Sequence, residues 1–304
     1  MNRRLTLLAA LAALLLGTRP AYAWDDFGHR VVARIAWENM TPQARARAIS
    51  ILHAAAPETG LRGSVNGTLS QQQQIALFVF AATWPDVVRD TTNPLRMEKY
   101  HHPYRHYVDT FWRQDTDFGP VIAVNRQPEG DLLRDAPRLQ QWLATGSPEL
   151  KALGLAWTLH LVGDIHQPLH ASGRISPRDP WGDGGGNTFR VGTRSLHSVW
   201  DGIHTDSLNA PRPTAPLATV TSAATMVMQH HPRSEFSAEI GQREFSQWAA
   251  ASVAIAQRDA YKAPLVRDQP VPPAYRTAAF LAAEPRIALA GYRLADLLNH
   301  VLGS

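Results

Sequence analysis

Histidine and aspartate recur four residues apart in the second half of the chain. The segment "HLVGDIHQPLH" contains His160 and Asp164, and "LHSVWD" repeats the pattern with His197 and Asp201 after a glycine run. Residues four apart on a helix share one face, so the first pair can present an imidazole and a carboxylate to one metal ion. His170 lies just beyond a helix-ending proline and can reach another ion.

Three further segments carry the same residue types. "WPDVVR" holds Asp86 and Arg89 at the end of an apolar helical stretch, and "HYVDTFW" begins an extended segment with His106. "WDDFGH" places His29 five residues after Trp24. Each segment alone could be an exposed ion pair or a packed histidine. Together with the first two segments they make a metal-binding protein the better interpretation.

The ligand types indicate zinc. Imidazole and carboxylate groups suit Zn²⁺, and the segments supply enough of them for three ions with coordination positions left open. Open positions are where a water is activated or a substrate oxygen is bound. The chain has no cysteine, which argues against a closed thiolate site and excludes a disulfide scaffold.

The first 23 residues predict a signal peptide. Arg3 and Arg4 precede an apolar run over 5–16, and Ala21-Tyr22-Ala23 supplies a small-x-small cleavage site. The apolar run is shorter than the about 20 residues that a membrane span needs, and no later stretch is suitable. We therefore expect an exported protein, periplasmic or extracellular, that begins at Trp24 and has no membrane contact after cleavage.

Length and charge set further limits. The 304-residue chain has a formal net charge of +4, but the expected signal peptide holds three of its basic residues and none of its acidic ones. The remainder is nearly neutral, so net charge alone indicates no polyanionic partner. We expect residues 24–304 to form a single, mainly α-helical domain. We also expect the protein to be a monomer.

Most of the chain shows helical spacing of its apolar residues. Thr41 is expected to cap one helix, with Pro42 at its first position. A β-hairpin is expected where "NTFRV" and "SLHSVW" flank Gly192. His101 and His102 are expected to be solvated, and Trp181 to be buried. Helices are expected over 27–39, 41–55, 71–84, 131–144, 148–166, 235–261 and 273–301, and loops over 57–69, 113–130 and 171–186.

In these motifs, their order and their spacing, the chain from Trp24 to Asp201 resembles the zinc-dependent S1/P1 nuclease family. The resemblance implies a helical fold of the phospholipase C and P1 nuclease type with three zinc ions. The ligands that it implies are Asp86, His106, His160 and Asp164 for one ion, His170, His197 and Asp201 for a second, and Trp24 (through its α-amine and carbonyl), His29 and bridging Asp164 for the third.

The resemblance also implies a reaction. Members hydrolyse single-stranded DNA and RNA to 5′-mononucleotides, and many remove 3′-phosphates from nucleotides. Asp86 and Arg89 would form the catalytic pair, with Arg89 stabilising charge on the phosphoryl oxygens. Tyr107 lies at the position that stacks on a base, Asp109 at the position that hydrogen-bonds the base edge, and Asn187 near the nucleotide site.

Two alternatives are weighed against this interpretation. A zinc-dependent phospholipase C shares the helical fold and much of the ligand order, but its last ligand is usually Glu, whereas Asp201 stands here. A metal-stabilised phosphate-binding protein without turnover has no need of Arg89 beside a ligand carboxylate. We expect the nuclease.

Overall fold

The computed structural model describes residues 24–62 and 67–303, so the predicted signal peptide lies outside the described residues. Helices dominate, as the sequence predicts. They are α2 (Asp26–Asn39), α3 (Pro42–His53), η2 (Pro57–Thr59), α4 (Gln71–Ala81), α5 (Trp84–Val87), α6 (Pro94–Tyr100), η3 (Pro103–His106), α7 (Leu132–Thr145), α8 (Pro148–His166), η4 (Pro168–Ala171), α9 (Leu196–Asp201), α10 (Ile203–Ser207), α11 (Leu217–His230), η5 (Arg233–Phe236), α12 (Ser237–Ile240), α13 (Phe245–Ile255), the π-helical turn η6 (Ala256–Ala260) and α14 (Pro273–Leu302).

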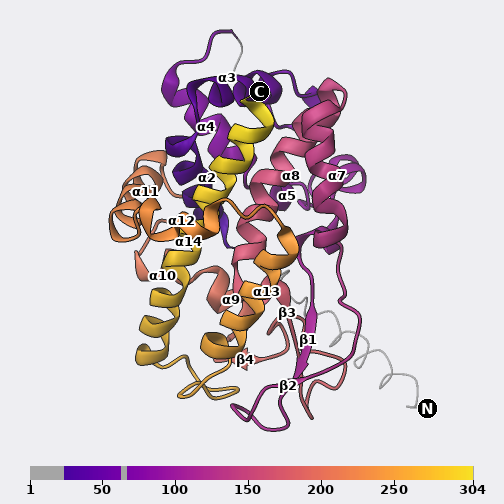
Figure 1. The fold of residues 1–304 in the computed structure, drawn as a ribbon, viewed down its shortest axis with the longest axis vertical. Coiled ribbons are helices and arrows are strands. Elements are labelled where there is room, and N and C mark those ends of the chain that lie inside the picture. The colour runs from indigo at the N-terminus through magenta and orange to yellow at the C-terminus, as the bar shows by residue number, and fades with distance from the viewer. Residues whose placement is uncertain (1–23, 63–66, 304) are drawn as a thin grey trace, which may run out of the picture.

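Helix α8 is enclosed by other helices. It packs against α7, α14, α13 and α3, while α14 also packs along α2 (Figure 1). Every residue from Gly154 to His166 is buried, which explains why the apolar residues of this helix surround it instead of forming one stripe. The histidine and aspartate of "HLVGD" are therefore placed inside the protein, where they are shielded from water.

A small sheet lies in the lower part of the view of Figure 1. Its first strand continues the extended segment expected from His106, whereas the other two lie in segments that we expected to be loops. Its order is β2 (Ile122–Ala123), β1 (Thr110–Arg113), β3 (Ser172–Ile175). β1 and β3 are parallel, with Thr110 opposite Ser172, and β1 and β2 are antiparallel. β2 and β3 have two and four residues, too few to show an alternating pattern, so the sequence did not reveal them.

The expected hairpin is present in shorter form. β4 (Arg190–Val191) pairs with β5 (Arg194–Ser195) around Gly192, whose φ of +56° favours glycine. The expectation that "SLHSVW" continues as a strand is wrong. The Ser195 hydroxyl accepts from the Ser198 N–H at 3.1 Å and caps helix α9, so His197 and Asp201 lie on a helix.

Helix boundaries vary in how well they were predicted. α8 has the expected bounds, and the Thr41 hydroxyl caps α3 by accepting from the Ala44 N–H at 3.1 Å. The single helix expected over 235–261 is wrong, because the chain forms η5, α12, α13 and η6 there, with a break after Gly241. α11, with its run of Thr and Val, was not predicted.

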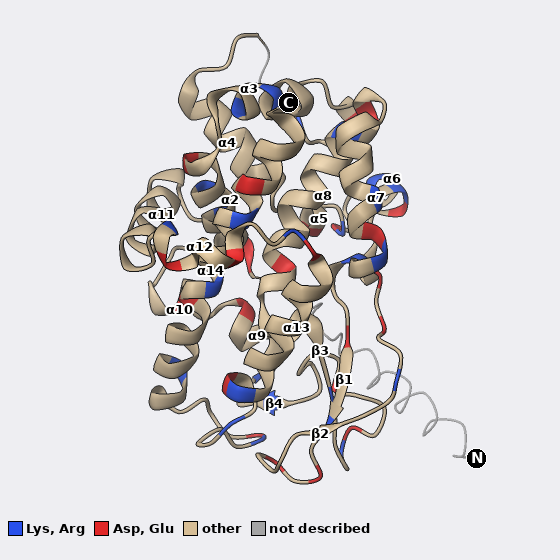
Figure 2. Ribbon diagram, viewed as in Figure 1, with Lys and Arg blue, Asp and Glu red and all other residues tan. Residues whose placement is uncertain are grey.

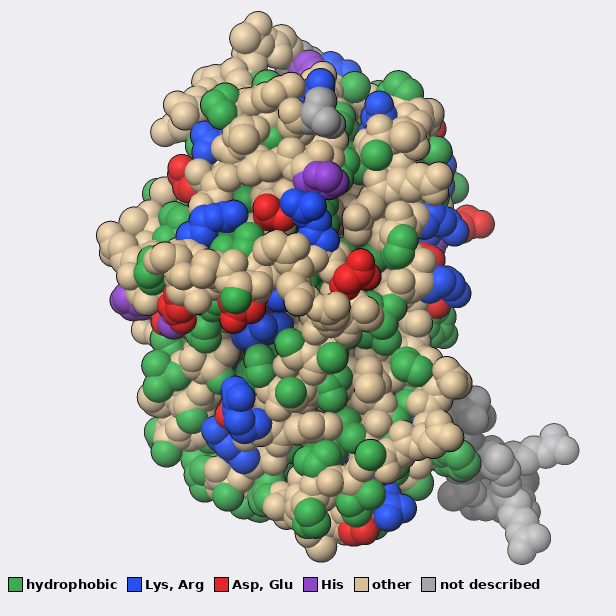
Figure 3. Space-filling model, in the orientation of Figure 1, with side chains coloured by type: hydrophobic (Ala, Val, Ile, Leu, Met, Phe, Trp, Pro, Cys, Tyr) green, Lys and Arg blue, Asp and Glu red, His purple; other side chains and the backbone are tan. Residues whose placement is uncertain are grey.

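Charged side chains of both signs are interspersed along the chain (Figure 2), and the face in Figure 3 likewise shows no large area of one sign. None of the described helices has the length and apolar character that a bilayer crossing requires.

Candidate metal centre and substrate cavity

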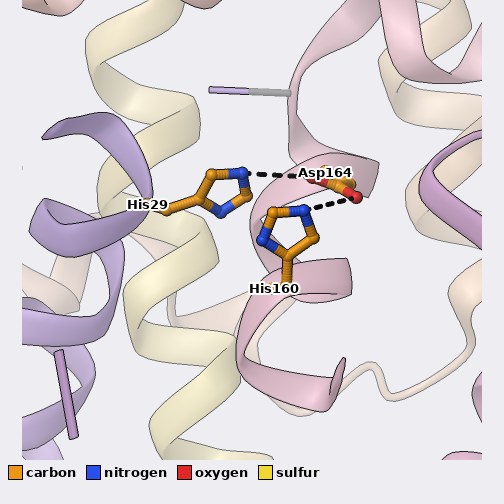
Figure 4. A group of neighbouring side chains, drawn as sticks. All are labelled: His29, His160 and Asp164. Carbon is orange, nitrogen blue, oxygen red and sulfur yellow. Dashed lines mark ion pairs between the residues drawn. The ribbon is translucent and has the colours of Figure 1, made fainter. Parts of the chain in front are cut away.

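Asp164 stands at the centre of a cluster of histidines. Its Oδ1 lies 3.2 Å from His29 Nε2, and its Oδ2 lies 3.2 Å from His106 Nδ1 and 3.4 Å from His160 Nε2. Figure 4 shows the rings of His29, from α2, and His160, from α8, beside this carboxylate. One carboxylate therefore faces imidazoles from two helices and from η3.

Asp86 joins the same cluster from α5. Its Oδ1 lies 3.8 Å from His160 Nε2 and 3.9 Å from His106 Nδ1. The short helix is fixed by Trp84, whose indole N–H donates to the Thr59 carbonyl at 2.7 Å. The Arg89 guanidinium forms an ion pair with the same Asp86 oxygen, and its Nε donates to the Asp86 carbonyl at 3.1 Å.

A second cluster contains His170, His197 and Asp201. Asp201 Oδ1 lies 3.8 Å from His170 Nε2 and 3.6 Å from His197 Nε2. The same oxygen accepts from Gln167 Nε2 at 2.7 Å, which ties α9 to the end of α8. The eight predicted ligands with ionisable side chains thus fall into compact groups: His29, His160 and Asp164; Asp86, His106 and His160; and His170, His197 and Asp201.

Hydrogen bonds to the backbone set the tautomers of three histidines. The Nδ1 atoms of His160, His170 and His197 lie 2.7, 2.6 and 2.7 Å from the carbonyl oxygens of Ala82, His106 and Gly185. A carbonyl only accepts, so each Nδ1 carries a proton, and in the neutral ring Nε2 keeps a lone pair. Such contacts commonly orient metal-binding histidines.

The facing nitrogens need either a shared proton or a bound cation. His170 Nε2 and His197 Nε2 lie 3.0 Å apart, and two neutral rings that both donate Nδ1–H would set their lone pairs against each other. Both oxygens of Asp164 and Oδ2 of Asp201 are buried and accept no hydrogen bond from the described residues. Buried acceptors without donors are costly unless a positive charge binds them. The donor set therefore fits bound metal ions.

Burial also sets the protonation states of these groups. It raises the pKa of Asp164 and Asp201 well above the usual carboxyl range, and lowers the pKa of His160 and His197 to about 3. The histidines are thus neutral, which is the form that coordinates metal. A bound cation would provide the charge that keeps both carboxylates ionised.

Trp24 lies beside the first cluster. It is fully buried, and a Cβ added at Gly163 would lie 3.7 Å from its Cδ1 and 2.6 Å from His29 Nδ1. Glycine at 163 is therefore what allows the start of α2 to approach α8. Asp25 fixes the neighbouring backbone, because its N–H donates to the Asp201 carbonyl at 3.0 Å. The α-amine proposed as a ligand requires cleavage after residue 23.

A cavity of about 330 Å³ opens beside both clusters. His106, His170 and His197 line it together with every residue predicted to touch the substrate: Arg89, Tyr107, Asp109 and Asn187. Burial, followed by the nearby charges of Asp183 and Glu129, raises the pKa of Asp109 to about 8. Its carboxyl group is therefore protonated at neutral pH and can donate as well as accept a hydrogen bond.

Sequence reasoning missed several contributors. Gln167 and Gly163 stand inside the "HLVGDIHQPLH" motif, but their partners are distant in sequence, and only the motif itself could have drawn attention to them.

His101 lines the cavity, although we expected a solvated loop histidine. Trp181, expected in the core, is 81% exposed.

The fold and the site define a helical protein with clusters of buried imidazoles and carboxylates that could hold metal ions beside a cavity. The sequence profile of the S1/P1 Nuclease family matches residues 24–303, and the chain belongs to this family. It is 26% identical over 207 residues to Nuclease S1 of Aspergillus oryzae (strain ATCC 42149 / RIB 40). That alignment covers 64% of this chain and 59% of the relative, so it spans less than two thirds of the relative's length.

Proposed function

We propose that this protein is a zinc-dependent nuclease that hydrolyses the phosphodiester bonds of single-stranded DNA and RNA to 5′-mononucleotides, and that it also removes 3′-phosphates from nucleotides. Family membership supports a nuclease. The substrates, the three zinc ions, export and the monomeric state are our proposals, and they extend the sequence-based expectations.

The observation that carries the proposal is the facing pair of His170 and His197. Each ring donates Nδ1–H to a backbone carbonyl, and the two Nε2 atoms meet at 3.0 Å. A shared proton or a bound cation can satisfy the two nitrogens. Their place in the wall of a cavity, beside the carboxylate of Asp201, favours the cation, because two imidazoles and a carboxylate form a metal ligand set.

The ligand sets follow the three clusters. Zinc bound there would supply a Lewis acid for phosphate oxygens and a water of lowered pKa. Six positive charges would face three ligand carboxylates, which favours an anionic substrate although the chain is nearly neutral. The proposed ligands are Asp86, His106, His160 and Asp164 for one ion, His170, His197 and Asp201 for a second, and Trp24, His29 and Asp164 for the third.

The remaining cavity residues would bind and orient the nucleotide. Tyr107 offers an aromatic face to a base, and such stacking contributes about 1–3 kcal/mol per base. Asp109 would hydrogen-bond the base edge, and Asn187 lies on the same cavity wall. Arg89 would stabilise charge that develops on the phosphoryl oxygens. A stacked base must first leave its duplex, which favours single-stranded substrates.

The decisive experiment uses the chain that begins at Trp24. It is loaded with zinc, its metal content is measured, and it is incubated with a single-stranded DNA oligonucleotide with and without a chelator. We expect mass spectrometry to detect 5′-mononucleotides that disappear with the chelator. An intact oligonucleotide from protein that holds its zinc would contradict the proposal, and phospholipid substrates would be tested next.

A further inference from the structure

Tyr104 is an exposed aromatic residue at the rim of the cavity. It belongs to η3, and 61% of its surface is exposed, whereas most aromatic side chains of the described residues are buried or partly buried. Its neighbour Pro103 lines the cavity. Isolated exposed apolar residues are common on protein surfaces, so exposure alone assigns no role to Tyr104.

The local backbone places Tyr104 beside Tyr107. The two residues are three apart: Tyr104 lies in the 3₁₀ helix η3, and Tyr107 is the extended residue that follows the helix. Their ring centroids lie 6.3 Å apart with an angle of 55° between the ring planes. The intervening Arg105 and His106 are buried. The tyrosines therefore form a neighbouring pair of aromatic side chains, one in the cavity wall and one at its rim.

The pair is held before any substrate arrives. The Tyr104 carbonyl accepts from the Asp131 N–H at 2.6 Å, and the Tyr107 carbonyl accepts from the Leu132 N–H at 3.2 Å. Arg105 is anchored to Asp135 of α7 by a 2.5 Å ion pair. A turn fixed at three points loses little backbone freedom on binding, which favours affinity.

The segment 130–132 also encloses Tyr107 from one side. Gly130 has a φ of +98°, and a Cβ there would lie 2.3 Å from the Tyr107 carbonyl and 2.8 Å from its ring. Protein thus covers part of the Tyr107 ring, while the same residue lines the cavity. The room for an additional base is at the exposed Tyr104.

We propose that Tyr104 is a second base platform, which stacks on the base next to the one that stacks on Tyr107. This inference rests on the proposed nuclease function and extends it. The ligand class is a single strand of at least two nucleotides, because a mononucleotide that occupies Tyr107 has no base left for Tyr104. Selectivity for oligonucleotides over mononucleotides would then come in part from this side chain.

The test compares two substrates in the zinc-loaded protein: a single-stranded oligodeoxyadenylate of seven nucleotides, and adenosine 3′-monophosphate. We expect Tyr104→Ala to lower the ratio of kcat/KM for the oligonucleotide to that for the mononucleotide by about 5- to 20-fold, the lower part of the range for base stacking. Tyr104→Phe keeps the aromatic face and is expected to keep most of the ratio.

Leu281→Ala is the matched control, because Leu281 on α14 is 64% exposed and lines no described cavity. The ratio of kcat/KM for the oligonucleotide to that for the mononucleotide should be the same in Leu281→Ala as in the parent. An unchanged ratio in Tyr104→Ala would overturn the inference while the nuclease function stands, and so would an equal loss in Tyr104→Phe, which would point to the hydroxyl. A parent protein that hydrolyses neither substrate would overturn the proposed function and this inference together.

Discussion

Arg89 brings a permanent positive charge to the wall of the cavity and contacts a carboxylate that also faces two histidines. The ion pair with Asp86 holds the guanidinium at the edge of the proposed metal cluster. A cation in this position repels metal ions, so a purely structural metal site would gain nothing from it. The proposed stabilisation of charge during the reaction would account for its position.

Replacing Arg89 with Ala should therefore separate turnover from metal binding. We expect kcat to fall about 10²- to 10³-fold, the usual effect of removing one group that stabilises developing charge. Zinc content, measured on the same sample, should remain that of the parent. Arg178→Ala is the control, since Arg178 is 69% exposed and pairs with Asp268 away from the cavity. Full activity in Arg89→Ala would show that this residue has no catalytic role.

Asp109 should make the free energy of unfolding depend on pH, and an asparagine at this position should remove that dependence. The folded protein holds its proton up to about pH 8, whereas the unfolded chain releases it near 3.8, so the Asp109 contribution to stability declines as pH rises between these values. Asp109→Asn is neutral throughout. Between pH 6 and pH 9 the unfolding free energy of the variant should therefore rise relative to that of the parent. Below pH 8 this difference should grow by at most about 1.4 kcal/mol per pH unit.

Urea unfolding of both zinc-loaded proteins at the two pH values measures this difference. Comparing the variant with the parent at each pH cancels the effect of protons that compete for the metal ligands. A difference that stays constant with pH would show that Asp109 is already ionised at pH 6.

Residue types indicated the proposed ligands, but contacts between distant segments decide how these side chains are oriented. The spacing of His160 and Asp164 was visible in the sequence, and both side chains lie in the cluster. The tautomer of His197 depends on the Gly185 carbonyl, and Asp201 is oriented by Gln167, 34 residues earlier. Such contacts depend on how distant segments pack, which no local pattern encodes.

At the scale of elements, Asp25 connects the start of α2 to the second cluster. Its Oδ1 caps the helix by accepting from the Gly28 N–H at 3.2 Å, and it also accepts from the Thr205 hydroxyl at 2.6 Å. Its Oδ2 lies 3.1 Å from Arg212. One side chain therefore fixes the segment that carries Trp24 and His29.

Asp25→Ala should consequently lower the free energy of unfolding by more than Asp26→Ala does. Loss of a helix cap costs about 0.5–2 kcal/mol, whereas the partly exposed pair of Asp26 with Arg30 contributes at most about 1 kcal/mol. We also expect Asp25→Ala to bind zinc more weakly, as measured by metal content after dialysis against a weak chelator. Equal unfolding free energies and equal zinc contents in the two variants would refute this role.

Helices with strong end signals were predictable, and irregular segments were not. Ser147 and Pro148 mark the start of α8, and Pro168 follows its end, so both bounds were visible. In the region 235–261 the internal break follows Gly241, a single helix-ending glycine within a stretch rich in Ala and Ser, and the prediction passed over it. The three-stranded sheet forms between β1 and β3, which are about sixty residues apart in sequence, so pairing rather than local propensity creates it.

At the scale of the whole molecule, the proposed ligands come from α2, α5, η3, α8, η4 and α9. Metal ions at these clusters would join segments that span the chain from His29 to Asp201. The chain has no disulfide to do the same, because it has no cysteine. Binding energy at such sites contributes directly to folding stability.

Removing zinc should therefore unfold the protein at a markedly lower temperature. Without metal, Asp164 and Asp201 are buried carboxyl groups that must hold protons, and His170 and His197 must share a proton between their Nε2 atoms. We expect chelation to lower the midpoint of thermal unfolding by at least about 10 °C, which for a chain of this size corresponds to several kcal/mol. Added Zn²⁺ should restore the midpoint, and Mg²⁺, which prefers oxygen ligands, should not. Equal midpoints before and after complete zinc removal would show that the clusters fold without metal.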